Sequence, residues 1–134
     1  MLRERGPADY ARIALAGIRI FNGAAGLLAP GVMAARTGVK RDADAPVLYP
    51  WRMFGIRTVL IGADLLSSNR EVRRHAVRAA VIVHASDVVA ASAMLRSDDV
   101  PRKTAIAATA ISSLNTVLAL IGGRDLRRSA RRRR

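Results

Sequence analysis

Charged residues lie inside the apolar stretches of this chain, where they need partners to be tolerated. The segment FGIRTVLIGADLL, residues 54–66, places Arg57 and Asp64 seven residues apart in an otherwise apolar run. This spacing puts both side chains on one face of a helix, but roughly 10 Å apart along its axis. Because they are too far apart to pair directly, we expect their partners on neighbouring helices.

The other apolar stretches carry the polar residues that could act as those partners: Arg12, Arg19, His84, Asp87 and Asn115. Guanidinium and carboxylate groups form strong, charge-assisted hydrogen bonds. His84 stands three residues before Asp87 on the same helical face and is suited to passing protons. This pair offers only two metal ligands, so no metal site is predicted.

Four apolar stretches must position these residues, and we predict that each is a helix. They cover residues 10–29, 50–67, 69–96 and 101–123. No segment alternates polar and apolar residues long enough to form a strand. At 134 residues the chain has room for one domain. The sequence therefore predicts an all-α domain over 1–123 and an arginine-rich, disordered tail over 124–134.

Local signals mark the ends of the predicted helices. Pro30 and Gly31 stop the first helix, and Pro50 begins the second at a tolerated first-turn position. Asn69 is expected to cap the third helix. The fourth follows the cap-like cluster at 97–99 and ends at 122–123, where two glycines stand.

The predicted helices are long and apolar enough to favour a membrane over water. Crossing a bilayer takes roughly 20 mainly apolar residues, and residues 104–123 supply that length without a charge. With four spans, the side that holds both termini would collect Arg3, Arg5, Arg70, Arg73, Arg74, Arg78 and the arginines of the tail. That side would then carry more basic residues than the opposite side. Because basic residues gather on the cytoplasmic side of membrane proteins, this excess favours a four-helix transmembrane bundle in the inner (plasma) membrane with both termini cytoplasmic.

Depth along each span sorts the buried charges into two layers. At about 1.5 Å per residue from the cytoplasmic ends, one layer near the midplane holds Arg19, Arg57, Asp87 and Asn115. A second layer, nearer the cytoplasm, holds Asp64, His84 and Arg12. Small residues on the same faces, including Gly23, Gly26, Gly55 and Gly62, permit close helix packing.

The midplane layer suggests what the bundle does. Its two arginines face a single carboxylate, so an anionic or quinone-like ligand is expected to compensate the surplus charge. The alternative interpretation is purely structural, with the same polar side chains holding the helices together. Support of a larger membrane complex or a homo-oligomer also fits this pattern.

Other classes of function have weaker support in the sequence. The net charge of +13 permits a soluble basic helical protein that binds nucleic acid through its tail. The tail lacks aromatic residues for base stacking, so contact with anionic lipids is favoured for its arginines, Arg127, Arg128, Arg131, Arg132, Arg133 and Arg134. A cleaved signal peptide ending near 32–35 is a further alternative. Nothing resembles a catalytic constellation, and the absence of cysteine excludes thiol chemistry and disulfides.

Three segments carry a resemblance to a known group of proteins: AGIRIFNGAAGLLAP (16–30), RMFGIRTVLIGADLL (52–66) and VHASDVVAASAM (83–94). They resemble a family of small, uncharacterised actinobacterial membrane proteins, and in outline the four-helix membrane proteins of the DoxX type. The resemblance implies that Arg19, Arg57, Gly62 and Asp87 occupy recurring polar and glycine positions. Thr58 departs from the pattern, because an aspartate commonly follows the arginine there. The family has no established activity that could be carried over to this chain, and the cofactor is unknown.

Overall fold

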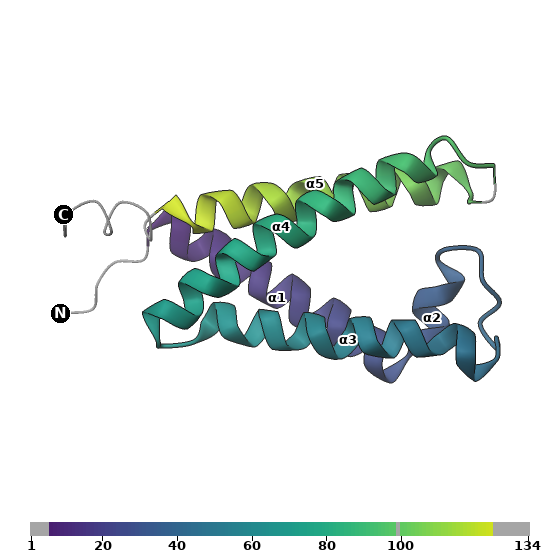
Figure 1. The fold of residues 1–134 in the computed structure, drawn as a ribbon, viewed down its shortest axis with the longest axis horizontal. Helices are drawn as coiled ribbons and strands as arrows, with labels where there is room; N and C mark the ends of the chain where they lie inside the picture. The colour runs from purple at the N-terminus through teal and green to yellow at the C-terminus, as the bar shows by residue number, and fades with distance from the viewer. Residues whose placement is uncertain (1–5, 99, 125–134) are drawn as a thin grey trace.

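The chain folds into an all-helical bundle, shown in a computed structural model that describes residues 6–98 and 100–124 (Figure 1). Its helices are α1 (Pro7–Leu28), α2 (Pro30–Ala35), α3 (Ala45–Leu66), α4 (Arg70–Met94) and α5 (Arg102–Gly122). No strand occurs within these two ranges. The predicted all-α class is therefore confirmed, with four long helices and one short helix in place of four.

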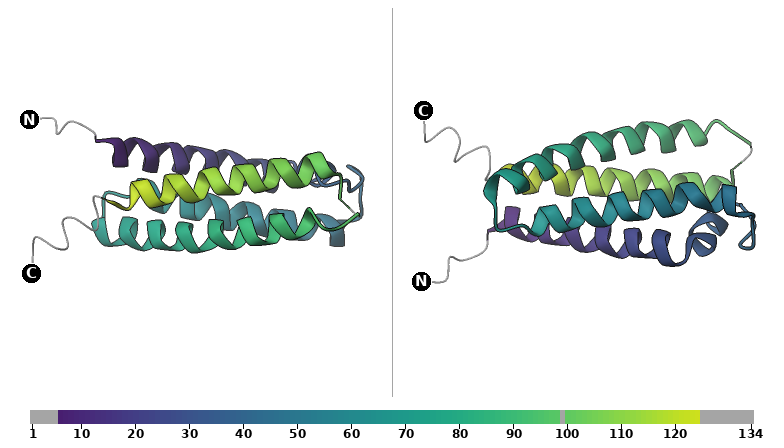
Figure 2. Two further views of the ribbon diagram at one scale, coloured as in Figure 1. Left: turned by 90° about the horizontal axis from the view of Figure 1, so that it is seen from above. Right: turned by 60° about the horizontal axis from the view of Figure 1, so that its bottom comes forward.

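The four long helices lie side by side in an elongated bundle (Figures 1 and 2). α1 packs on α3 and α5, and α4 packs on α5 and α3, so the helices form a ring in which α1 and α4 are diagonal. The start of α1, the end of α3, the start of α4 and the end of α5 share one end of the bundle. The short α2 lies at the other end, against α1 and α3.

The helix ends agree with the sequence in three places and depart from it in two. α1 stops at Leu28, just before Pro30 and Gly31, as predicted. Asn69 caps α4 as predicted, its Oδ1 accepting hydrogen bonds from the backbone of Glu71 and Val72 at 2.8 and 3.3 Å. α5 ends at the expected glycines. Pro30, however, also opens α2 inside the expected linker. Pro50 lies within α3, which begins five residues earlier with a proline in its first turn.

The two prolines of α3 explain its early start. A proline in the first turn removes only a backbone donor that has no partner inside the helix, so Pro46 favours initiation there. Pro50 would otherwise donate to the carbonyl of Pro46, and losing that single bond near a helix end is tolerable. The first-turn assignment of Pro50 was therefore wrong by one turn.

Glycines bring α1 and α3 into backbone contact. A Cβ on Gly55 would lie 2.6 Å from the carbonyl oxygen of Gly23, and one on Gly23 would lie 2.7 Å from that of Gly55. A Cβ on Gly62 would lie 2.7 Å from Ile20 Cγ1 and 3.2 Å from the carbonyl of Ala16. The predicted close packing through small residues is confirmed for this helix pair, where any side chain would force the helices apart.

The interior is built mainly from alanine. Among the described residues, the buried apolar positions other than Leu15, Leu65 and Val77 are Ala8, Ala11, Ala16, Ala34, Ala76, Ala80, Ala91, Ala105 and Ala119. Leu15 and Leu65 are the largest side chains that are fully buried. Such an interior buries little apolar area per residue, so it gives the bundle little hydrophobic stabilisation.

Large apolar side chains lie on the outside of the bundle. Phe21, Ile82 and Val89 are 72%, 70% and 72% exposed. The outer face of α5 presents Ile106, Ile111, Leu114, Val117 and Leu120. Three of the described helices, α1, α4 and α5, are long and apolar enough to cross a membrane. α3 is not among them, and it carries three charged residues, Arg52, Arg57 and Asp64.

Candidate functional site: a polar cluster inside the bundle

A chain of three polar side chains crosses the centre of the bundle. Arg19 of α1 is only 3% exposed, and its Nη1 lies 2.5 Å from Nε2 of His84 on α4. Nδ1 of His84 lies 3.4 Å from Oδ2 of Asp87, one turn further along the same helix. Because arginine can only donate, Nε2 of His84 accepts and the ring proton belongs on Nδ1, facing the carboxylate.

This Arg19–His84–Asp87 cluster joins the diagonal pair of helices. α1 and α4 are not among the helix pairs that pack closely, since α3 and α5 lie between them. The Arg19–His84 contact is thus a direct polar link across the middle of the ring. The Asp87 carboxylate balances the guanidinium through the imidazole, which makes burial of the Arg19 charge tolerable.

A cavity of about 120 Å³ adjoins the cluster. Each long helix contributes polar side chains to its wall, and these are Arg19, Asn22, Thr58, His84, Asp87, Ser112 and Asn115. Apolar residues, among them Ile18, Phe54 and Ile111, complete the lining. The carboxylate-bearing side chain of Asp87 is 45% exposed, so this wall of the cavity reaches the outside of the bundle.

Two buried polar atoms at this site have unused hydrogen-bonding capacity. Nε of Arg19 is a donor and Oδ1 of Asn115 is an acceptor, and neither has a hydrogen-bond partner among the described residues. Both residues line the cavity. Leaving such groups unpaired costs about 1–3 kcal/mol each, so a polar group in the cavity that pairs with them is favoured.

The structure brings together only part of the predicted midplane layer. Arg19, Asp87 and Asn115 meet at the cavity, as expected, but Arg57 is exposed on the outer face of α3. Asp64 is exposed as well. Neither side chain forms a hydrogen bond or ion pair with another described residue, so the inward orientation predicted for both was wrong.

The glycines of α3 explain this difference. Gly55 and Gly62 repeat at the same spacing as Arg57 and Asp64, but two residues earlier, which places the two pairs about 160° apart around the helix. Only one pair can face the bundle. Because the glycines allow backbone contact with α1, they face inward and the charges face outward.

The second predicted layer does not form either. His84 belongs to the Arg19 cluster, while Arg12 lies near the end of the bundle and pairs with Asp9 at 3.1 Å. Arg12 also donates from Nη1 to the backbone carbonyl of Leu65 at the end of α3. It therefore ties the start of α1 to the last turn of α3, where a positive charge is favourable.

Sequence reasoning missed three residues of the cavity wall as site residues: Asn22, Thr58 and Ser112. A signal for two of them was present in the sequence. Asn22 follows Arg19 by three residues and Ser112 precedes Asn115 by three, so each shares a helical face with a predicted site residue. The tail arginines proposed to contact lipid, from Arg127 to Arg134, lie outside the described residues.

Comparison with known protein families, with curated proteins and with solved structures finds no match to this chain. Within residues 6–98 and 100–124, no group of three or more His, Cys, Asp or Glu side chains could hold a metal ion.

Proposed function

We propose that the protein is a small multi-pass membrane protein whose Arg19–His84–Asp87 cluster holds the bundle together and binds a small oxygen-bearing ligand, anionic or quinone-like, in the adjoining cavity. Four spans in the inner (plasma) membrane, with both termini cytoplasmic, complete the proposal. Membrane placement and ligand binding rest on different observations and are tested separately.

Membrane placement rests on the distribution of side chains, which is the reverse of that in a soluble protein, with small residues inside and large apolar residues outside. Alanine and glycine fill the interior, whereas Phe21, Ile82, Val89 and the apolar face of α5 point outward. Membrane helices pack through small residues and present large apolar side chains to lipid. An outer surface of this kind is rare on soluble monomers. Tyr10 and Tyr49 are 62% and 61% exposed and stand near the starts of α1 and α3, which lie at opposite ends of the bundle, so they suit the two membrane interfaces.

Ligand binding rests on the unpaired Nε of Arg19 in a cavity that also holds an unpaired amide oxygen. The surplus positive charge expected from the sequence is absent from the site, because Arg57 lies on the outside of the bundle and Asp87 balances Arg19. A carboxylate or quinone oxygen accepts from Nε, and a water bound beside it can donate to Oδ1 of Asn115, so that both atoms are satisfied. The volume of about 120 Å³ is somewhat below the ~150 Å³ of an engineered cavity that admits benzene. It therefore suits a carboxylate or the oxygen-bearing edge of a quinone.

Fractionation tests the membrane placement. Membranes from cells that express the full chain are washed with high salt, then with alkaline carbonate, and finally dissolved in detergent. We expect release by detergent alone, because an integral bundle has no aqueous form to return to. Release by salt would contradict membrane insertion and favour the basic nucleic-acid-binding alternative.

Mass spectrometry of small molecules that copurify in mild detergent tests the ligand. The wild type is compared with Arg19→Gln and Arg57→Gln, which lose the same charge from the inside and the outside of the bundle. We expect an oxygen-bearing molecule with the wild type and Arg57→Gln that is lost from Arg19→Gln. Identical small-molecule contents in all three proteins would show that the cluster is only structural.

A further inference from the structure

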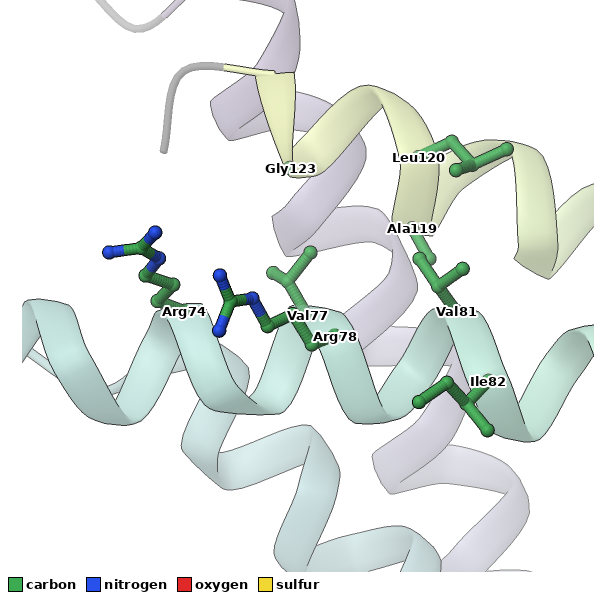
Figure 3. A pocket seen from close by; sticks show the side chains of 8 residues that line it. All are labelled: Arg74, Val77, Arg78, Val81, Ile82, Ala119, Leu120 and Gly123. Carbon is green, nitrogen blue, oxygen red and sulfur yellow. The ribbon is translucent and has the colours of Figure 1, made fainter. Parts of the chain in front are cut away.

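A second hollow lies on the surface of the bundle, away from the polar cluster. This α4–α5 groove is lined by Arg74, Val77, Arg78, Val81, Ile82 and Leu120, with small residues of α5 behind them (Figure 3). Its volume of about 360 Å³ exceeds that of the polar cavity. It lies toward the end of the bundle where α4 begins and α5 ends.

The groove is divided into a charged end and an apolar part. The guanidinium groups of Arg74 and Arg78 lie together at one end, and Val81, Ile82 and Leu120 lie beyond them along the helices (Figure 3). Both arginines are exposed, and none of the lining residues is acidic. A ligand with an uncompensated negative charge at one end and an apolar chain at the other matches this division.

From this arrangement we infer that the α4–α5 groove binds an acidic phospholipid, with its phosphate on Arg74 and Arg78 and its acyl chain along Val81, Ile82 and Leu120. The inference rests on the membrane placement proposed above. In that placement Arg74 and Arg78 lie about 6 and 12 Å along α4 from its cytoplasmic start, at the depth of head groups and the outermost hydrocarbon.

The chemistry of the two arginines favours an acidic lipid over a zwitterionic one. A guanidinium presents paired donors whose geometry matches phosphate oxygens. In phosphatidylcholine the choline offsets the phosphate charge, so two adjacent cations gain less from it than from phosphatidylglycerol. A basic residue near a membrane surface contributes about 1 kcal/mol toward anionic lipid, which is roughly a fivefold preference.

Tryptophan quenching by brominated lipids measures this preference at the groove itself. The reporter is the full chain with Ile82→Trp in a Trp51→Phe background, reconstituted into vesicles that contain brominated phosphatidylglycerol or brominated phosphatidylcholine. We expect phosphatidylglycerol to bind at least about fivefold more strongly at this position. In Arg74→Gln/Arg78→Gln the preference should fall to about one. The double variant Arg96→Gln/Arg102→Gln removes the same charge at the other end of α4 and α5 and should retain it.

Three results would overturn the inference. They are equal binding of the two lipids to the parent protein, an unchanged preference in Arg74→Gln/Arg78→Gln, and an equal loss in the control variant. Vesicle flotation separates this outcome from a failure of the membrane placement. A chain that floats with the vesicles but lacks the preference contradicts only the groove, whereas a chain that does not float contradicts the membrane placement itself.

Discussion

Arg19 of α1 and His84 of α4 meet across the middle of the bundle, with Nη1 and Nε2 2.5 Å apart, although α1 and α4 stand on opposite sides of the ring of helices. The contact closes a polar chain that ends at Asp87. This polar link adds to the apolar cluster in which Leu15 and Ala16 of α1 lie with Ala76, Val77 and Ala80 of α4.

Removing the central member of this chain should destabilise the bundle. In His84→Leu, Arg19 loses its acceptor and Asp87 loses its neighbour, and an unpaired buried polar group costs about 1–3 kcal/mol. We expect a lower unfolding temperature in mild detergent. His75→Leu is the matched control, because His75 is exposed on the same helix. Equal unfolding temperatures for the two variants would show that the cluster is not stabilising.

The second prediction concerns the close contact between α1 and α3, which one added methyl group should disrupt. In Gly55→Ala the new Cβ would lie 2.6 Å from the carbonyl oxygen of Gly23, which is too close, so the helices must move apart. Overpacking of this kind costs about 1–3 kcal/mol. Gly17→Ala adds the same methyl group where no atom lies within 4 Å. We expect a loss of folded yield and thermal stability in Gly55→Ala only, and a stable Gly55→Ala would contradict the close approach.

The outward orientation of Arg57 gives a third prediction, opposite in sign to that for Arg19. In the proposed membrane placement, an arginine at the centre of α3 would cost about 2.5–3.5 kcal/mol on the insertion scale. Arg57→Leu should therefore keep or raise the amount of inserted protein, measured by membrane yield. Arg19→Leu should lower that yield, because it leaves His84 and Asp87 without their partner. A loss of protein with Arg57→Leu would reveal a partner for this side chain in an assembly.

The cap of α4 makes a fourth prediction, at a position outside the polar cluster. Asn69 Oδ1 accepts two backbone hydrogen bonds, so Asn69→Ala leaves both donors without this partner. We expect a loss of about 1 kcal/mol in unfolding free energy, measured by thermal or denaturant unfolding in detergent. Ser68→Ala, at the neighbouring exposed position, should change little, and a similar loss in both variants would argue against a specific cap.

The sequence predicts local features of this fold better than the orientation of its helices. Asn69 as a cap and the glycine stop of α5 depend on residues within one turn, and both occur as expected. The short α2 was missed because its six residues lie in a segment rich in charge, glycine and proline. Such a short helix depends on its contacts with α1 and α3.

The candidate site shows where periodicity alone is insufficient. α3 offers two stripes of equal spacing, one of glycine and one of charge, and both were predicted to face inward although only one can do so. Packing decides between them, since the backbone contact at Gly23 and Gly55 leaves no room for a guanidinium. The pairing of Arg19 with His84 also depends on the relative axial positions of α1 and α4. Depth estimates that assume ideal ends cannot fix these to within one turn.

The glycine contact between α1 and α3 bears on how the chain would be made. Among the long helices of the described chain, α3 is the one that is not apolar enough to qualify as a span by itself. In the proposed membrane setting, α1 leaves the ribosome first and is already in the lipid when α3 reaches the translocon. α3 would then enter the lipid against the helix that is already there, with the earlier helix acting as an intramolecular chaperone for the later one.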